Sequence, residues 1–296
     1  MSDNKKAVIA AIIGNSIFGF SFLFSKIALG YVSPLVLLAV RFDIAFLSMC
    51  LLAGLKIIRL DYRGKDLKPL FLLGLLQPIF YFICENYGLN HASSSIAGVL
   101  IAVIPVVTFF TGSVFLKESF KVRQLMWAFV SLLGVCIISM VGQDAGNLEL
   151  IGLILLLGAV LSGAVYNTVS RGISGQFSPS ERTFMMFLMG AVFFTVMSVF
   201  MTEGSYISVL SEAFSHMDFI VTVIYLGAVS SIIAFYCLNY SVSYLPVRQA
   251  ASFSSLTSII SVFAGLIFLH EKVSIIQTVA IFLILFGVYQ VNFSEA

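Results

Sequence analysis

Apolar segments of about twenty residues recur along the whole chain, and they constrain its fold more than any other feature. Residues 7–29, 35–55 and 152–170 are three examples. A helix of about 20 residues crosses the ~30 Å hydrocarbon core of a bilayer. Because helices satisfy their own backbone hydrogen bonds in lipid, the pattern predicts an all-α membrane protein whose main partner is the lipid bilayer.

The composition agrees with this fold class and excludes several others. The chain is 60% hydrophobic and 10% charged, whereas soluble domains carry about 25% charged residues. A net charge of +2 gives no basis for nucleic-acid binding. The cysteines lack CxxC or Cys/His spacing, so neither a disulfide framework nor a zinc site is predicted. HExxH, GxSxG and Walker motifs are absent from the sequence, so we expect no enzyme activity, no ATP hydrolysis and no cofactor.

Polar breaks divide the chain into about ten predicted transmembrane helices joined by short loops. Positively charged loop residues favour the cytoplasmic side. With the N-terminus inside, Lys272 is the only loop Lys or Arg that falls outside, which predicts a multi-pass plasma (inner) membrane protein with both termini cytoplasmic. The first apolar run is too long for the core of a signal peptide and is interpreted as a retained span. The spans start near Ala7, Pro34, Leu67, Ser94, Val122, Glu149, Arg182, Asp218, Pro246 and Ser274.

The second half of the chain repeats the first, which we interpret as a duplication. Five spans per half is an odd number, so the second copy enters the membrane from the opposite side and forms an inverted repeat. We expect a first repeat at residues 1–143 and a second at 144–296. The ungapped matches include Phe82 with Phe235, Cys84 with Cys237, Asn86 with Asn239, Glu118 with Glu271 and Gly134 with Gly287, and a slightly shorter shift pairs Ser25-Lys26 with Ser170-Arg171 and Ser33-Pro34 with Ser178-Pro179.

Two related halves of opposite orientation can exchange roles, which makes outward-facing and inward-facing states similar in energy. This favours transport by alternating access. The alternative is that the duplication only builds a stable bundle, as in a non-transporting membrane subunit or scaffold. An ion channel is less favoured, because the sequence shows no selectivity-filter pattern.

The repeated turns also carry a family resemblance. The Lys117-Glu118 and His270-Glu271 turns, Pro105 in the fourth span and the Gly-Val pairs at 134–135 and 287–288 resemble the two EamA domains of the drug/metabolite transporter superfamily. The resemblance implies ten helices around a central cavity and, commonly, export of amino acids, other metabolites or toxic compounds. Ser258 stands where the first half has Pro105, so a helix break is expected in the fourth span and is in doubt in the ninth.

Ionisable side chains inside a membrane usually face a partner or a wet cavity, because each costs roughly 2.5–3.5 kcal/mol at mid-bilayer. Five occur within the predicted spans: Lys26, Arg41, Asp43, Glu85 and Arg248. Glu85 follows Gln77 and Tyr81 at helical spacing, so the three line one helix face. We predict that this face borders a cavity where Glu85 serves solute binding or proton coupling. The alternative is a structural ion pair of Glu85 with Lys26 or Arg41.

Arg41 and Asp43 lie about 200° apart around one helix, so at most one of them points into a central cavity. One is expected to contact solute and the other to pair with a neighbouring helix, and a purely structural ion pair remains open. Arg248 follows Pro246 and is either an interfacial anchor or an inner-gate charge. Further candidate solute-binding residues are Tyr166, Asn167, Asn86 and Asn239, whose amides and hydroxyl can equally join helices.

Together these patterns predict a secondary transporter, and an exporter as the resemblance implies, for small organic solutes such as amino acids, related metabolites or drugs. Cavity charges of both signs suit a zwitterion. In the absence of an ATPase motif, a coupled proton or an exchanged solute is the expected driving partner. Oligomeric state is not predicted.

Overall fold

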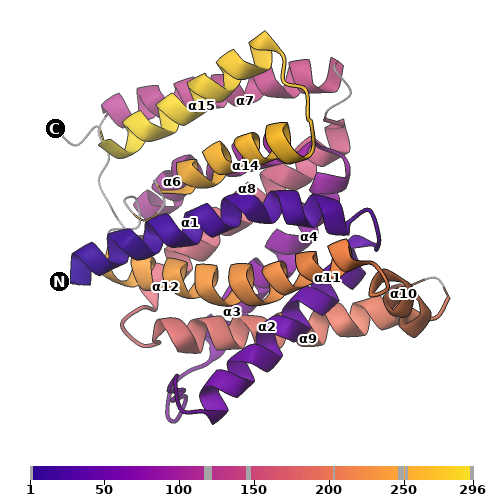
Figure 1. Ribbon diagram of the computed structural model, residues 1–296. Helices are drawn as coiled ribbons and strands as arrows, with labels where there is room; N and C mark the ends of the chain where they lie inside the picture. Colours follow the sequence, from indigo (N-terminus) through magenta and orange to yellow (C-terminus); the bar gives the residue numbers. More distant parts are fainter. Residues whose placement is uncertain are drawn as a thin grey trace.

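The computed structural model describes residues 3–116, 122–144, 148–202, 204–245, 250 and 253–293. These residues form a bundle of helices, with one isolated β-bridge between Ala92 and Leu148 (Figure 1). The first half holds α1 (Asp3–Ala28), α2 (Pro34–Gly54), α3 (Lys68–Gly74), the π-helical segment η1 (Leu75–Phe80), α4 (Tyr81–Asn90), α5 (Ser94–Ile101), α6 (Ile104–Leu116) and α7 (Val122–Asp144). The second holds α8 (Leu150–Gly172), α9 (Pro179–Met201), α10 (Tyr206–Ala213), α11 (Met217–Ile224), η2 (Tyr225–Ala234), α12 (Phe235–Tyr244), α14 (Ser254–Phe268) and α15 (Ile275–Phe293).

The described helices account for ten membrane spans. Seven are long and apolar enough by themselves, counting 68–90, 94–115 and 217–244 as single composite spans. Three shorter apolar helices, at 126–138, 256–268 and 275–290, lie within α7, α14 and α15. The predicted all-α architecture of ten helices is therefore confirmed.

Local sequence signals fix where the repeated helices begin. The second helix of each repeat, α2 and α9, starts with Pro at its first position after an extended Ser, Ser33 or Ser178. Proline suits that position because its missing N–H needs no partner and its φ is already helical. At α9 the Ser178 side chain also accepts from the Glu181 N–H, while the Glu181 carboxylate accepts from the Ser178 N–H, which completes a capping box.

The helix break predicted from Pro105 is present in the first repeat. There α5 ends at Ile101 and α6 begins at Ile104, with Pro105 in the first turn of α6. Proline is tolerated in a first helical turn and breaks a helix interior. At the matching position of the second repeat, α14 continues through Ser258.

Helix packing follows a pseudo-two-fold symmetry. The corresponding helices α2 and α9 pack on each other, and so do α7 and α15. In addition α1 packs on α12 and α14, and its counterpart α8 packs on α4, α5 and α6. Each repeat therefore inserts its first helix against the third and fourth helices of the other, so the core lies between the two halves.

Repeat-related cations bind the ends of repeat-related helices. Lys26 Nζ, on α1, donates to the carbonyls of Leu89 and Ala92 at 2.6 and 2.7 Å, at the end of α4. Arg171 Nη1, on α8, donates to the carbonyls of Val242 and Ser243 at 3.1 and 2.7 Å, at the end of α12. A cation at a helix C-terminus satisfies carbonyls that lack helical partners and complements the helix dipole. Lys26 therefore forms hydrogen bonds with the end of α4 rather than an ion pair with Glu85.

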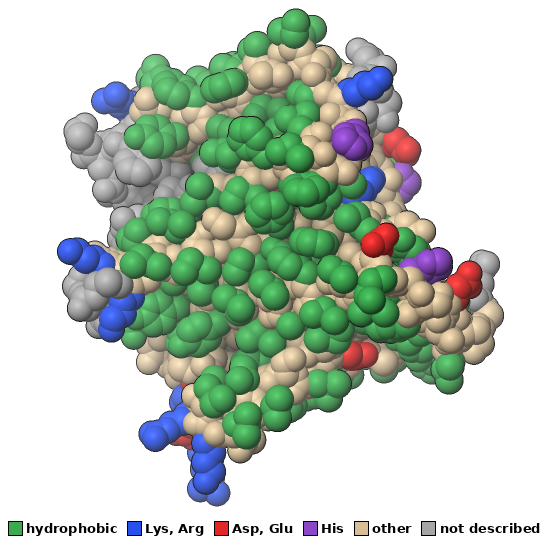
Figure 2. Space-filling view, viewed as in Figure 1, with side chains coloured by type: hydrophobic (Ala, Val, Ile, Leu, Met, Phe, Trp, Pro, Cys, Tyr) green, Lys and Arg blue, Asp and Glu red, His purple; other side chains and the backbone are tan. Residues whose placement is uncertain are grey.

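Surface chemistry divides the molecule into an apolar belt and two polar ends. Both chain termini lie on the same side of the bundle, at the left of Figure 1. In Figure 2 apolar side chains cover the middle, most visible Lys and Arg side chains lie on the side of the termini, and most visible acidic side chains lie on the other. Large apolar side chains such as Phe200 and Ile275 are 82% and 85% exposed, as expected for a surface that faces lipid.

Candidate functional site

A central cavity of about 90 Å³ lies between the two repeats. Both halves line it, so no single repeat forms the site. Its first-repeat lining comes from α1, α2, η1, α4, α5 and α6, and its second-repeat lining from α8, α12, α14 and the segment before α14. The polar lining residues are Asn15, Ser21, Arg41, Gln77, Tyr81, Glu85, Asn167, Ser241, Ser254 and Thr257.

Arg41 is the cation of the cavity. Its side chain is buried, with 1% of the residue exposed. Nε donates to Ser231 Oγ at 3.2 Å and Nη2 donates to Ser230 Oγ at 3.0 Å, both on η2. The guanidinium carbon lies 4.5 Å from the centre of the Phe82 ring, which adds a cation–π contact. Nη1 is buried and has no hydrogen-bond partner, so Arg41 is a cavity-lining residue with one unused charged donor.

Glu85 is the acidic group of the cavity. Gln77, Tyr81 and Glu85 all line it, because η1 and α4 continue one another and place these residues on a common face. The Tyr81 hydroxyl lies within hydrogen-bonding reach of the carboxyl, and Arg41 is the positive charge that acts on it. Among the described residues Arg41 and Glu85 form no ion pair within 4.0 Å, so the two charges face one cavity without neutralising each other directly.

The second repeat contributes hydroxyl and amide groups. Asn167 of α8 and Ser241 of α12 line the cavity. Thr257 of α14 donates to the backbone oxygen of Asn15 at 2.9 Å, which ties α14 to α1. Ser254 Oγ, at the start of α14, lines the cavity and is buried without a partner. Unpartnered polar groups in a membrane interior cost free energy, and Ser254 Oγ and Arg41 Nη1 are two such groups.

Comparison with known proteins identifies the family and the fold of the chain that forms this cavity. The EamA-like transporter family model matches residues 5–140 and 150–293. The chain belongs to the EamA-like transporter family. It is 32% identical over 292 residues to the uncharacterized transporter YcxC of Bacillus subtilis, covering 97% of this chain and 92% of the relative.

Other relatives of this EamA-like transporter have more informative names. It is 23% identical to the probable amino-acid metabolite efflux pump of Escherichia coli, covering 97% of this chain and 94% of that one. It is 24% identical to the probable terminal-alkyne amino-acid exporter of Streptantibioticus cattleyicolor, over 78% of this chain and 74% of that one. A solved protein crystal structure superposes on this chain with a TM-score of 0.69 at 17% identity, with 98% of both chains covered. The two proteins therefore share the fold.

Two further predicted site residues, Asp43 and Asn86, are not among the described residues that line the cavity. Asp43 faces α9, where Thr195 Oγ1 donates to both carboxylate oxygens at 2.9 Å. Asn86 Nδ2 donates to the Phe82 carbonyl at 3.0 Å, one turn back in α4, while its Oδ1 has no partner. Arg248 lies outside the described residues.

Tyr166 and Asn239 belong to a second buried polar cluster, built around Arg182 in this EamA-like transporter. The Tyr166 hydroxyl donates to Asn239 Oδ1 at 2.9 Å. Arg182 Nη1 donates to the Ser170 carbonyl at 2.8 Å and to Ser170 Oγ at 2.6 Å, and Nη2 donates to the Asn239 carbonyl at 3.0 Å and to Ser243 Oγ. The cluster joins α8, α9 and α12 within the second repeat, so its contacts are those of a helix-packing network.

Sequence reasoning missed Arg182 as a buried group, because it was counted among the cytoplasmic loop charges. Arg182 is 0% exposed and lies in the first turn of α9. The available signal was the Ser-Pro-x-Glu helix start at 178–181, which places the following residue inside the helix rather than in a loop.

On the side of the transporter opposite the termini, a carboxylate binds the N-terminus of α5. Glu271, in the turn between α14 and α15, accepts from the N–H groups of Ser94 and Ser95 at 2.7 and 3.0 Å and from their hydroxyls at 2.8 and 2.5 Å. Ser261 Oγ also donates to the Ser94 carbonyl at 2.8 Å. An alanine methyl at Gly265 would collide with the Glu271 carboxylate and Ser95 Oγ. These contacts fix α5 of one repeat to α14 of the other above the cavity.

Proposed function

We propose that this EamA-like transporter exports a small solute bearing a carboxylate, of the amino-acid type, by alternating access between its two repeats. The observation that carries the proposal is the unpartnered Nη1 of Arg41 in a cavity that both repeats line. Arginine presents several fixed N–H donors that match a carboxylate. A solute carboxylate bound there would use the idle donor while Nε and Nη2 keep their serine partners.

Glu85 and the opposite wall complete a zwitterion site in this proposal. A carboxylate solute with an ammonium group would place the positive end toward Glu85 and Tyr81. Polar groups of Asn167 and Ser254 would bind the remaining hydrogen-bonding atoms. The size of the cavity agrees with a small solute, because 90 Å³ corresponds to roughly three waters at about 30 Å³ each.

The charge distribution and the names of the relatives support a proposed orientation and direction of transport. We propose that the side of the termini is cytoplasmic, because the Lys and Arg side chains concentrate there. The Glu271 contacts would then close the outer side, so the conformation described corresponds to a state closed to the exterior. The names of two relatives, an amino-acid metabolite efflux pump and an amino-acid exporter, support export. We also propose that the repeats divide at residues 143 and 144.

Glu85 is the proposed coupling group. Its carboxyl is buried, with 4% of the residue exposed. The charge of this carboxyl determines how strongly it attracts the Arg41 guanidinium or the ammonium group of a solute. Uptake and loss of one proton at this carboxyl would couple solute movement to a proton gradient, and exchange of two solutes is the alternative driving partner.

The test is flux of radiolabelled glycine, L-alanine and L-serine in proteoliposomes of the purified protein. We expect saturable flux of at least one of them, a loss of at least tenfold in Arg41→Gln, and wild-type flux in the surface control Arg123→Gln. Flux that depends on pH in the wild type and is flat in Glu85→Gln would support proton coupling, whereas a full pH response in Glu85→Gln would contradict it. Absence of saturable flux for all three amino acids would contradict the proposed solute class.

A further inference from the structure

A second cavity, separate from the central one, opens on the apolar surface between α3–η1 and α9. It measures about 560 Å³ and exposes no polar surface. Phe71 and Ile79 form one wall, and α9 residues from Met185 to Met197 form the other. Phe71, Val192 and Val196 are 50%, 58% and 48% exposed, so this groove faces the surrounding lipid. We call it the α3–α9 groove.

The length of the α3–α9 groove matches one lipid tail. The 12 residue steps from Met185 to Met197 correspond to ~18 Å along a helix at 1.5 Å per residue. One leaflet provides about 15 Å of a ~30 Å hydrocarbon core. The groove is thus long enough to hold a single acyl chain along most of its length.

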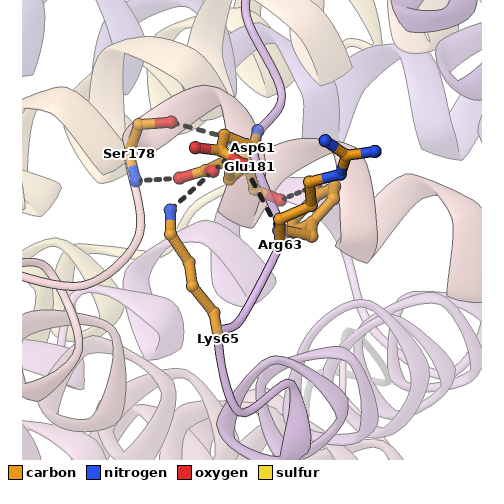
Figure 3. Close-up of polar contacts among 6 residues, drawn as sticks. Asp61, Arg63, Lys65, Ser178 and Glu181 are labelled. Atoms are coloured by element: carbon orange, nitrogen blue, oxygen red, sulfur yellow. Dashed lines mark hydrogen bonds and ion pairs between the residues drawn. The ribbon is translucent and has the colours of Figure 1, made fainter.

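The mouth of the α3–α9 groove lies beside basic side chains. Lys68 is the first residue of α3 and is exposed, and Phe71 of the groove follows it by one turn. The loop preceding α3 adds Arg63, which is also exposed. In Figure 3 the Arg63 guanidinium points away from Glu181. Residues 55–68 contain five basic residues, Lys56, Arg59, Arg63, Lys65 and Lys68, against two acidic ones, Asp61 and Asp66.

Contacts with α9 hold this basic loop in place. Lys65 Nζ lies 2.8 Å from Glu181 Oε1, which also accepts from the Asp61 N–H at 3.0 Å (Figure 3). The Tyr62 hydroxyl donates to the Glu181 carbonyl at 2.8 Å. Lys65 is therefore already paired, whereas Lys68 and Arg63 are exposed.

We propose that the α3–α9 groove binds one acyl chain of an anionic glycerophospholipid whose phosphate is held by Lys68 and Arg63. The apolar walls select hydrocarbon and the basic mouth selects a negative headgroup, since each Lys or Arg near a membrane surface favours anionic lipid. A zwitterionic phosphatidylcholine has the same tails without the net charge. The lipid would contact α3 of the first repeat and α9 of the second, so it would bridge the two halves independently of the central cavity and of the proposed solute.

Native mass spectrometry of the delipidated protein, titrated with palmitoyl-oleoyl phosphatidylglycerol or phosphatidylcholine, tests the proposal. We expect phosphatidylglycerol to bind at least fivefold better in the wild type. The double variant Arg63→Gln/Lys68→Gln should bind the two lipids equally, and Val192→Trp, which fills the groove, should lose the first bound lipid of either kind. Arg123→Gln and Val221→Trp, an exposed basic residue and an exposed valine elsewhere, serve as matched controls.

Melting temperatures within 3 °C of wild type would show that each variant is folded, and Val192→Met replaces Val192→Trp if the latter is not. Equal binding of the two lipids by the wild type would overturn the proposal. The same loss of preference in Arg123→Gln, or undiminished lipid binding in the folded groove variant, would overturn it as well.

Discussion

Removing the Glu271 carboxylate should open the transporter on the side opposite its termini. The carboxylate accepts four hydrogen bonds from the first two residues of α5, two on each oxygen. A glutamine can keep the two bonds on one oxygen, but its NH₂ group cannot accept the two from Ser95. Hydrogen bonds to a charged group contribute about 1.5–3 kcal/mol each, so the closed state should lose at least about 3 kcal/mol relative to the open one. At 1.4 kcal/mol per tenfold, that corresponds to a population shift of about a hundredfold.

Labelling of a cavity cysteine measures this shift. In a variant without native cysteines, Phe22→Cys places a thiol on the cavity wall, and a membrane-impermeant maleimide is added from the side opposite the termini. We expect Glu271→Gln to raise the labelling rate by at least tenfold. Glu149→Gln is the control, because its contact with His91 on the same side is an exposed hydrogen bond, and even an exposed ion pair is worth only about 0–1 kcal/mol. Unchanged labelling in Glu271→Gln, or an equal increase in Glu149→Gln, would refute the closing role of Glu271.

Three further predictions concern stability. Gly190→Ala should lower the unfolding free energy by about 1–3 kcal/mol, because the added methyl would lie 2.8 Å from a phenylalanine ring of α2. Thermal melting should show no such loss for Gly54→Ala, because a methyl there would have no neighbouring atom within 4 Å. Equal melting temperatures of the two variants would contradict this prediction. Lys26→Met and Arg171→Met should destabilise the protein to a similar extent, about 1–3 kcal/mol each, because the two cations bind repeat-related helix ends. A large effect of only one of these substitutions would argue against equivalent roles. Burial and the nearby Glu181 charge raise the pKa of the loop residue Tyr62 above 10. Its stabilising hydrogen bond is therefore fully present below pH 10 and is lost at strongly alkaline pH, when the hydroxyl ionises. Melting curves of Tyr62→Phe should be less sensitive to alkaline pH than those of the wild type, and identical sensitivity would contradict the assignment.

The sequence was sufficient for the architecture because membrane burial and duplication leave periodic signals. Apolar length predicted the spans, and the matched Ser-Pro helix starts and Ser25-Lys26/Ser170-Arg171 pairs predicted which helices correspond. Pro105 also predicted the break between α5 and α6. Each of these inferences depends on residues within one helix or on residues at a constant separation.

The contacts of the candidate site depend on helix rotation and on the packing between repeats, which a linear pattern does not encode. Helical spacing limited Arg41 and Asp43 to opposite faces, but only the packed structure places Arg41 in the cavity and Asp43 against Thr195. Glu271 was recognised as a repeated turn residue, although its partners lie in the other repeat, 176 and 177 residues away. Long-range pairing of this kind arises from tertiary packing.

The most direct test of a carboxylate-binding cavity compares an amino acid with its amide, which keeps the ammonium group and lacks the carboxylate charge. Proteoliposomes containing wild type, Arg41→Gln or Arg123→Gln would be assayed for L-alanine flux with L-alaninamide as competitor or as labelled solute. We expect wild type and Arg123→Gln to carry L-alanine and to discriminate against the amide by at least tenfold, because a site built to bind a charged group rejects an analogue that lacks it. Arg41→Gln should lose this discrimination. An Arg41→Gln variant that keeps both the wild-type L-alanine flux and the wild-type preference for acid over amide would contradict the role of Arg41 in solute binding.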